Sequence, residues 1–291
     1  MVSPTESQFG YAKCNSCGVL ATKAKLSNVQ DLTETKQFNH RFNKLGESLY
    51  GINAWTRFNF ISRATRKNSG QILDYGCGRG DLLSKFHKFG WEVHGAEYSE
   101  NTSKEARQIH KNILLRSDFE NETIAYYSSS SFDLVTSFHN LEHLSDPRYF
   151  IEKCSEVIRK GGHLVLEVPN LESWQSRITG SKWLYLDPMN HTFHFTPKGL
   201  QILLQGNNFE IKRVSSLAFW MGTIGMTSSL INQVRKSENS FFHQMKKADS
   251  HPRVIVEGIL FALLYPIGVG IELLSVLARS GSVIRIVAVR K

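Results

Sequence analysis

Short apolar segments alternate with amphipathic ones through the middle of the chain. The apolar segments have the length of buried strands, and the segments between them place hydrophobic residues at helical spacing. The expected strands are Gln71–Tyr75, Trp91–Ala96, Ile113–Arg116, Phe132–Phe138, His163–Val168, Phe209–Ser215 and Val283–Val289. Strands separated by helices favour βαβ units. We therefore expect an α/β fold, with a seven-stranded, mainly parallel sheet and helices on both of its faces.

Local signals indicate where several helices begin and end. Asp146-Pro147 supplies an N-cap and a first-turn proline, and Thr196-Pro197 repeats the pattern. The first of these helices is expected to end at Lys160, before Gly161-Gly162, and the second at Gly206. The other expected helices are Ala54–Lys67, Asp81–Phe89 and Ser99–Lys111, and residues 1–33 are expected to be a loop.

Two connections are longer than ordinary loops, at Asn170–Phe195 and at roughly Leu217–Ser282. Insertions of that size on an α/β scaffold usually carry substrate recognition. The expected division of the chain is an N-terminal segment with a helical cap (1–69), a central domain (70–216 and 282–291), and an apolar helical insertion before the last strand (217–281).

Composition and charge narrow the classes of function. The 291 residues are 41% hydrophobic and 21% charged, which is the balance of a folded globular protein. Lys and Arg number 35 against 26 Asp and Glu, and the net charge of +9 suggests anionic partners. Nucleic acid is not expected, because the basic residues are scattered and form no binding motif. Residues 1–13 lack an apolar signal segment, so a cytoplasmic location is expected.

Glycines follow the first expected strand at every second position, in the segment Asp74-Tyr75-Gly76-Cys77-Gly78-Arg79-Gly80. Glycine there permits positive φ and close approach of the backbone to a ligand, and the next helix offers its N-terminal N–H groups. Glu97 ends the second strand and Asp118 follows the third, where carboxylates can accept hydrogen bonds from a ribose and an exocyclic amine. A polar run, 137–143, ends the fourth strand. A ligand would lie across these strand ends.

In order and spacing, these motifs resemble those of the class I S-adenosylmethionine-dependent methyltransferases. The similarity is to the branch that includes ubiquinone-biosynthesis-type enzymes and methyltransferases of bacterial polysaccharide and glycolipid clusters. It extends to Leu141-Glu142-His143-Leu144-x-Asp146-Pro147, to Lys160-Gly161-Gly162, and to Asp187-Pro188-x-x-His191 followed by Phe195-Thr196. The resemblance covers roughly 70–215 and the last strand, and it implies a Rossmann-like fold.

The resemblance also implies S-adenosyl-L-methionine as the cofactor and assigns it a set of residues. The glycine loop would carry its methionine part, Glu97 its ribose, and Asp118 with Phe119 its adenine, while His139 would face the sulfonium. The residues implied to bind the cofactor are Asp74, Gly76, Gly78, Gly80, Glu97, Tyr98, Asp118, Phe119 and His139.

The expected reaction is methyl transfer to a small-molecule, sugar or glycolipid acceptor at a hydroxyl, with a lipid quinone precursor as the alternative. A hydroxyl must lose its proton, and His191, or else His139, is the candidate base. His191 as a packing residue remains open. So do a non-catalytic methyltransferase-like scaffold and a nicotinamide-dependent oxidoreductase, although the glycine spacing differs from Gly-x-Gly-x-x-Gly.

Cys14 and Cys17 form a single Cys-x-x-Cys pair. A tetrahedral zinc site needs four ligands, and the sequence supplies no obvious second pair. Free thiols, and no metal site, are therefore expected.

The insertion contains the most apolar stretch of the chain, from Val254 to Ala278. Its only charged residues are Glu257 and Glu272, and Pro266 would interrupt a helix. Charges in the bilayer centre are costly, so a transmembrane span is not expected. The alternatives are helices packed into the protein or a dimer interface, and helices lying in a membrane interface, which the basic flanks of the stretch would suit.

Overall fold

The computed structural model describes residues 10–23, 44–115, 124, 127, 129, 131–235 and 252–291. The chain divides into two compact units. Unit 1 comprises Met1–Val29, Pro169–Gly199 and Ser215–Ile284, and unit 2 comprises Gln30–Val168, Leu200–Val214 and Arg285–Lys291. Most of the long connection after the fifth strand thus belongs to the same unit as the apolar insertion, and the cap helix to the same unit as most of the sheet. The expected division into 1–69, 70–216 with 282–291, and 217–281 stays a prediction.

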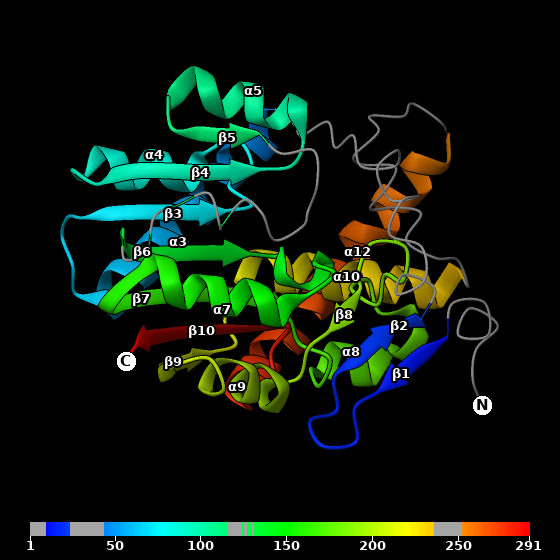
Figure 1. The fold of residues 1–291 in the computed structure, drawn as a ribbon. Helices are drawn as coiled ribbons and strands as arrows, with labels where there is room; N and C mark the ends of the chain where they lie inside the picture. Colours follow the sequence, from blue (N-terminus) through cyan, green and yellow to red (C-terminus); the bar gives the residue numbers. More distant parts are fainter. Residues whose placement is uncertain are drawn as a thin grey trace. The chain divides into compact units, whose positions relative to one another are not determined.

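Unit 2 is built on a seven-stranded sheet with the strand order β5-β4-β3-β6-β7-β10-β9 (Figure 1). The strands are β3 (Gln71–Tyr75), β4 (Glu92–Glu97), β5 (Ile113–Leu115), β6 (Phe132–Phe138), β7 (Ile158–Pro169), β9 (Phe209–Ser215) and β10 (Val283–Arg290). The pairs β3–β4, β3–β6, β4–β5 and β6–β7 are parallel, and β10 runs in the opposite direction (Figure 1). The expected seven-stranded, mainly parallel sheet is therefore confirmed.

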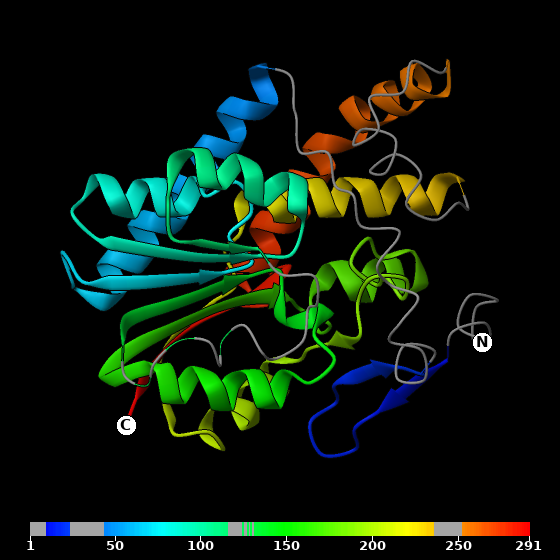
Figure 2. The same cartoon turned by 45° about the horizontal axis from the view of Figure 1, so that its top comes forward.

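Helices cover both faces of this sheet. They are α3 (Lys44–Thr65), α4 (Asp81–Lys88), α5 (Glu100–Ile109), α7 (Pro147–Val157) and α9 (Pro197–Gln205), with a short 3₁₀ helix, η2 (Leu141–His143). Figure 2 shows α4 and α5 on one face and α7 on the other. The core between α3, α4 and the sheet includes Phe58, Phe86 and Trp91, all buried. Burial of these apolar side chains is the main force that holds the layers together.

The expected start of α7 is confirmed, but its expected end is wrong. Asp146 is the N-cap and accepts a hydrogen bond from the Tyr149 N–H at 2.9 Å. The helix then ends at Val157, and β7 begins at once, so Gly161 and Gly162 lie inside the strand. The register with β6 shifts in this region, and Gly161 has a φ of 76°. These glycines therefore serve an irregularity of the strand rather than the end of a helix.

The N-terminal segment contains more regular structure than the expected loop. Two short strands, β1 (Tyr11–Lys13) and β2 (Leu20–Thr22), form an antiparallel hairpin, and β2 pairs with β8 (Phe193–His194) in a three-stranded sheet. The cap helix α3 also begins at Lys44, ten residues before the expected start.

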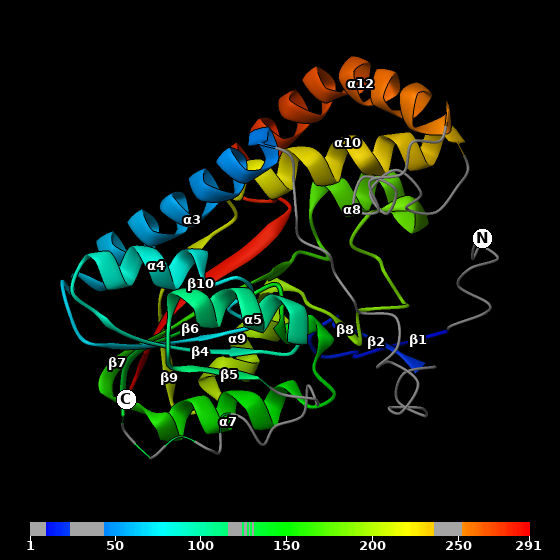
Figure 3. The same ribbon diagram turned by 90° about the horizontal axis from the view of Figure 1, so that it is seen from above.

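In the described residues of unit 1, this small sheet is joined by the helices α8 (Trp174–Thr179), η3 (Gly180–Lys182), α10 (Phe219–Arg235) and α12 (Pro252–Leu277). Figure 3 shows α10 lying alongside α12, with α8 on its other side. The backbone N–H of Leu184 donates to Ser229 Oγ at 2.9 Å, which fixes the segment after η3 to α10. The expected insertion is thus helical over Phe219–Arg235 and Pro252–Leu277.

One described helical segment, Val256–Leu277 within α12, is long and apolar enough to span a membrane by length and composition. Its mean hydropathy is 2.1, and only 17% of its most apolar window is buried. That low burial separates it from the core helices of globular proteins, which are apolar because they are enclosed.

Candidate active site

The loop between β3 and α4 has the backbone that its glycines predict. Gly76, Gly78 and Gly80 have φ values of 83°, 57° and 82°, in the left-handed region where L-residues with side chains are strained. A Cβ atom at Gly76 would lie 3.2 Å from Asn140, and one at Gly80 would lie 3.2 Å from His110. A Cβ at Gly78 would meet nothing within 4 Å, so the loop presents open backbone at that point.

Glu97, the last residue of β4, is joined to this loop by hydrogen bonds. Its Oε2 accepts from the Gly78 N–H at 2.8 Å, and its Oε1 accepts from the Ser99 N–H at 2.8 Å. Burial raises the pKa of this carboxyl, although these hydrogen bonds favour its charged form. A carboxylate has about four acceptor sites, so Glu97 can also accept from the hydroxyls of a ligand.

Asp74 lies beneath the loop as a buried carboxyl on β3. It accepts a hydrogen bond from Thr136 Oγ1 of β6 at 2.6 Å, which links the two central strands. Burial raises the pKa of Asp74 to about 6 despite that hydrogen bond. This hydrogen bond therefore fixes the Asp74 side chain directly before the glycine loop.

Two buried polar atoms at the end of β6 have no hydrogen-bond partner within the described part of the chain. They are Ser137 Oγ and Asn140 Nδ2. Asn140 faces Gly76, as the short Cβ distance shows. Buried polar groups are normally paired, so unpaired ones beside a glycine loop suit a site that receives a polar ligand.

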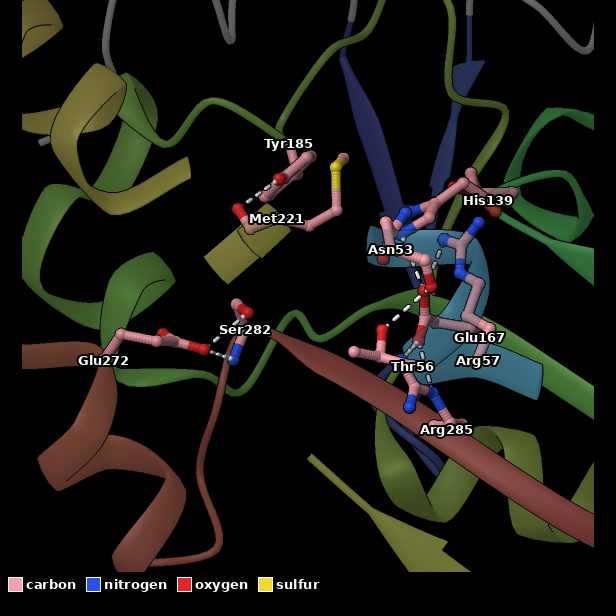
Figure 4. A network of polar contacts seen from close by, with 11 residues as sticks. Asn53, Thr56, Arg57, His139, Glu167, Tyr185, Met221, Glu272, Ser282 and Arg285 are labelled. Atoms are coloured by element: carbon pink, nitrogen blue, oxygen red, sulfur yellow. Dashed lines mark hydrogen bonds and ion pairs between the residues drawn. The ribbon is translucent and has the colours of Figure 1, made fainter. Parts of the chain in front are cut away.

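Sequence analysis missed a buried ion cluster in unit 2, which is centred on Glu167 of β7 (Figure 4). The Glu167 side chain is fully buried, and its carboxylate pairs with Arg57 of α3 at 2.8 Å and with Arg285 of β10. The two guanidinium groups hold the pKa of Glu167 well below its usual range, although burial opposes the charged form. The available sequence signal was a single carboxylate within the apolar strand Leu164–Val168. A charge there requires partners.

His139 belongs to the same cluster and follows β6. Its Nε2 lies 3.1 Å from Glu167 Oε1, and its Nδ1 lies 3.6 Å from Glu142 Oε1. Burial lowers its pKa, but the two carboxylates outweigh burial and raise the pKa to about 9. His139 therefore carries a positive charge at neutral pH. Its φ of 51° is strained for a side-chain-bearing residue, as is common at functional sites.

His191 lies in unit 1, whereas the glycine loop and Glu97 lie in unit 2. It is buried, and its Nδ1 is 2.9 Å from the Tyr185 carbonyl oxygen. A carbonyl only accepts, so Nδ1 carries the proton of that hydrogen bond, and the lone pair of the neutral ring is on Nε2. The Thr22 hydroxyl of β2 donates to the His191 carbonyl oxygen at 2.9 Å and fixes the backbone there.

The remaining expected site residues are distributed as follows. Tyr98 directly follows β4 and is half-buried. Asp118 and Phe119 lie outside the described residues, so their adenine-binding role stays a prediction. Cys14 and Cys17 are free thiols in the turn between β1 and β2.

The strand order, with the glycine loop after β3 and a carboxylate at the end of β4, defines unit 2 as a Rossmann-like domain of the methyltransferase type. The chain belongs to the methyltransferase domain family, whose model matches residues 51–214, more than half of the chain.

Two relatives and one solved structure illustrate the similarity. A ubiquinone biosynthesis O-methyltransferase of Idiomarina loihiensis is 30% identical over 157 residues, which are 52% of this chain and 61% of that protein. One of Mesorhizobium japonicum is 29% identical over 184 residues, 59% of this chain and 73% of that protein. The crystal structure of a SAM-dependent methyltransferase from Archaeoglobus fulgidus superposes with a TM-score of 0.53 at 22% identity. The superposition covers 82% of this chain and 93% of the Archaeoglobus fulgidus protein. At this identity, the similarity shows that the two proteins share a fold.

Proposed function

We propose that the protein binds S-adenosyl-L-methionine in unit 2 and transfers its methyl group to a small-molecule acceptor. The observation that carries this proposal is the pair of hydrogen bonds that ties the Glu97 carboxylate to the glycine loop and to the first turn after β4. The Glu97 carboxylate, which can accept hydrogen bonds from ribose hydroxyls, and the open backbone at Gly78 are thereby held at the same strand ends. When bound, the cofactor supplies an already activated methyl group on its sulfonium, so the protein mainly aligns the acceptor and excludes water.

The residues in unit 2 fit this cofactor. Glu97 offers acceptors to the ribose hydroxyls, and Gly78 gives close access to the backbone. Ser137 and Asn140 offer unpaired polar atoms at the end of β6. The proposed adenine contacts are Asp118 and Phe119. The proposed neighbour of the sulfonium end is His139, whose positive charge is offset by the carboxylates of Glu142 and Glu167 beside it.

Calorimetric titration with S-adenosylmethionine tests the proposal. We expect Glu97→Ala to weaken binding by about tenfold to 150-fold, because a charged acceptor contributes about 1.5–3 kcal/mol. Glu92→Gln is the matched control, since that carboxylate lies at the opposite end of β4 and is exposed. Equal affinities of wild type and Glu97→Ala would remove Glu97 from the ribose site. A wild-type protein that binds no cofactor would favour a non-catalytic scaffold.

The proposed acceptor carries a hydroxyl, on a sugar, a glycolipid or another small molecule. Both relatives are named as O-methyltransferases of ubiquinone biosynthesis, which supports oxygen as the methylated atom and keeps a lipid quinone precursor as the alternative. Incubation with labelled S-adenosylmethionine and fractionated cell extract would identify the acceptor class. Label in the aqueous phase would favour a soluble sugar or small molecule, and label in the lipid phase a glycolipid or a quinone.

His191 is the proposed base. Its hydrogen bond to Tyr185 supports this role, because it places the lone pair on Nε2. The protonated state of His139 makes that residue the weaker candidate, and suits it to a fixed positive charge. We expect His191→Gln to lower turnover by about 10²–10⁴. His194→Gln, another buried histidine of the same segment, is the control. Wild-type turnover in His191→Gln would end the assignment.

The proposed location is cytoplasmic and peripheral, on the cytoplasmic face of the membrane. The apolar character of α12 supports this location. A lipid-linked acceptor would be presented at that face.

A further inference from the structure

The outward face of α12 carries no charge over the length of Val256–Leu277. Its exposed positions hold glycine, alanine, proline and aliphatic residues. The large hydrophobic side chains that are exposed there are Val256, Ile259, Leu263, Ile267, Leu273, Leu274 and Leu277. Exposed apolar surface of this length is unusual on a globular protein and marks a site of interaction.

The two acidic residues of α12 both point inward, within unit 1. Glu257 is buried and forms an ion pair with Arg235 of α10. Glu272 is also buried. It accepts a hydrogen bond from Gln175 Nε2 at 2.8 Å. It accepts another from Ser282 Oγ at 2.7 Å, which Figure 4 shows. The two carboxylates that disfavour lipid contact, Glu257 and Glu272, are therefore absent from the exposed face of α12.

Close contacts hold α12 against α10. A Cβ atom on Gly268 would lie 2.4 Å from Thr227 Oγ1, and one on Gly222 would lie 2.1 Å from Glu272 Oε1. A helix that crossed a bilayer alone would lose these contacts and expose both carboxylates, and Glu272 would lie within the hydrocarbon region, where a charge is costly. The packing therefore favours a helix that lies on a membrane over one that crosses it.

We propose that the outward face of α12 docks on an anionic phospholipid bilayer, with its aliphatic side chains in the interfacial region. The composition of the face favours lipid over a protein partner. Protein interfaces are centred on Trp, Tyr, Met and Arg, and none of these is among the exposed residues of Val256–Leu277.

The basic residues on either side of the apolar stretch also favour an anionic bilayer. In the sequence, Lys246, Lys247 and Arg253 precede the apolar face, and Arg279 follows it. Basic residues beside an anionic leaflet contribute about 1 kcal/mol each. The inference deepens the proposed peripheral location and rests on it. It is independent of methyl transfer, since a protein that failed to bind S-adenosylmethionine would still bind vesicles.

Flotation of the full chain with vesicles of phosphatidylcholine and phosphatidylglycerol tests the inference. We expect the wild type to float at low salt, and Leu263→Glu/Leu274→Glu to lose about tenfold or more in affinity. The control, Ile109→Glu/Ile202→Glu, makes the same change of charge at exposed apolar positions on α5 and α9 and should float like the wild type. Circular dichroism of both double variants verifies folding.

Four results would overturn the inference. Wild-type protein that stays in the soluble fraction, or a control that loses binding equally, would exclude docking through this face. A dimer that only Leu263→Glu/Leu274→Glu converts to monomers, with no flotation of any form, would assign the face to a second copy of the chain. Protein that remains in cell membranes after an alkaline carbonate wash would indicate a spanning helix.

Discussion

At the residue scale, the largest single effect is expected at the buried Glu167 carboxylate. Glu167→Gln keeps the shape of the side chain but leaves Arg57 and Arg285 without their counter-charge. We expect the free energy of unfolding to fall by about 3–5 kcal/mol. Glu156→Gln breaks the exposed pair with Lys153 and should cost less than about 1 kcal/mol. Urea unfolding compares the two variants, and equal losses would contradict the buried cluster.

His139 gives the same cluster a dependence on pH. Its pKa is about 9 in the folded protein and about 6.5 in an unfolded chain. Its contribution to stability is therefore complete below about pH 6.5 and is lost as the pH rises through about 9. Between these values the wild type should lose about 1–3 kcal/mol more than His139→Asn. Asn is the matched substitution because it tolerates the φ of 51°. Unfolding is measured for both proteins at about pH 6.5 and about pH 9. Equal losses of unfolding free energy in the wild type and in His139→Asn would refute the ion pairing.

The site residues that the sequence predicts belong to local motifs, whereas those that it does not predict come from positions far apart in the chain. The glycine loop and Glu97 follow directly from local motifs at strand ends. The Glu167 cluster joins residues 57, 139, 167 and 285, which only the folded sheet brings together. No pattern at fixed spacing could have predicted it.

At the element scale, the pair α10–α12 depends on glycine at its closest approach. Gly268→Ala would press a methyl group against Thr227 and should destabilise the protein by about 1–3 kcal/mol. Gly270→Ala lies on the same helix with nothing within 4 Å, and should stabilise it by about 0.5–1 kcal/mol. The thermal unfolding midpoints of the two variants, measured by calorimetry, should thus shift in opposite directions from that of the wild type. Shifts of the same sign would mean that helix propensity outweighs the contact.

Element types were easier to predict than element ends. The N-caps of α7 and α9 are local, so Asp146 and Thr196 predicted both starts. The end of α7 depends on the register between β6 and β7, which is not local, and the glycine pair was therefore misinterpreted. The strands β1 and β2 are three residues each, too short to show a period, and β2 depends on pairing with the distant β8.

At the scale of the whole molecule, the described residues include one hydrophobic cluster in unit 2, around Phe86, and another in unit 1, around Trp183. A ligand bound by unit 2 should stabilise that unit first, by about 2.7 kcal/mol at a hundredfold excess over its dissociation constant. Hydrogen exchange with S-adenosylmethionine should therefore show slower exchange in β3 and β4 and unchanged exchange in α10 and α12. Equal protection of all four elements would mean that the units unfold as one.

The place of β10 sets an order of events during synthesis. β10 lies between β7 and β9, but residues 216–282 separate it from β9 in the chain. At about 5–20 residues per second, a ribosome needs about 3–13 seconds to make that segment. Throughout this time β7 has an unpaired edge, and α10 and α12 are made during it, before β10. The apolar helix thus exists before the sheet is complete, and a bilayer near the ribosome would meet α12 before a finished sheet is there to bind a ligand.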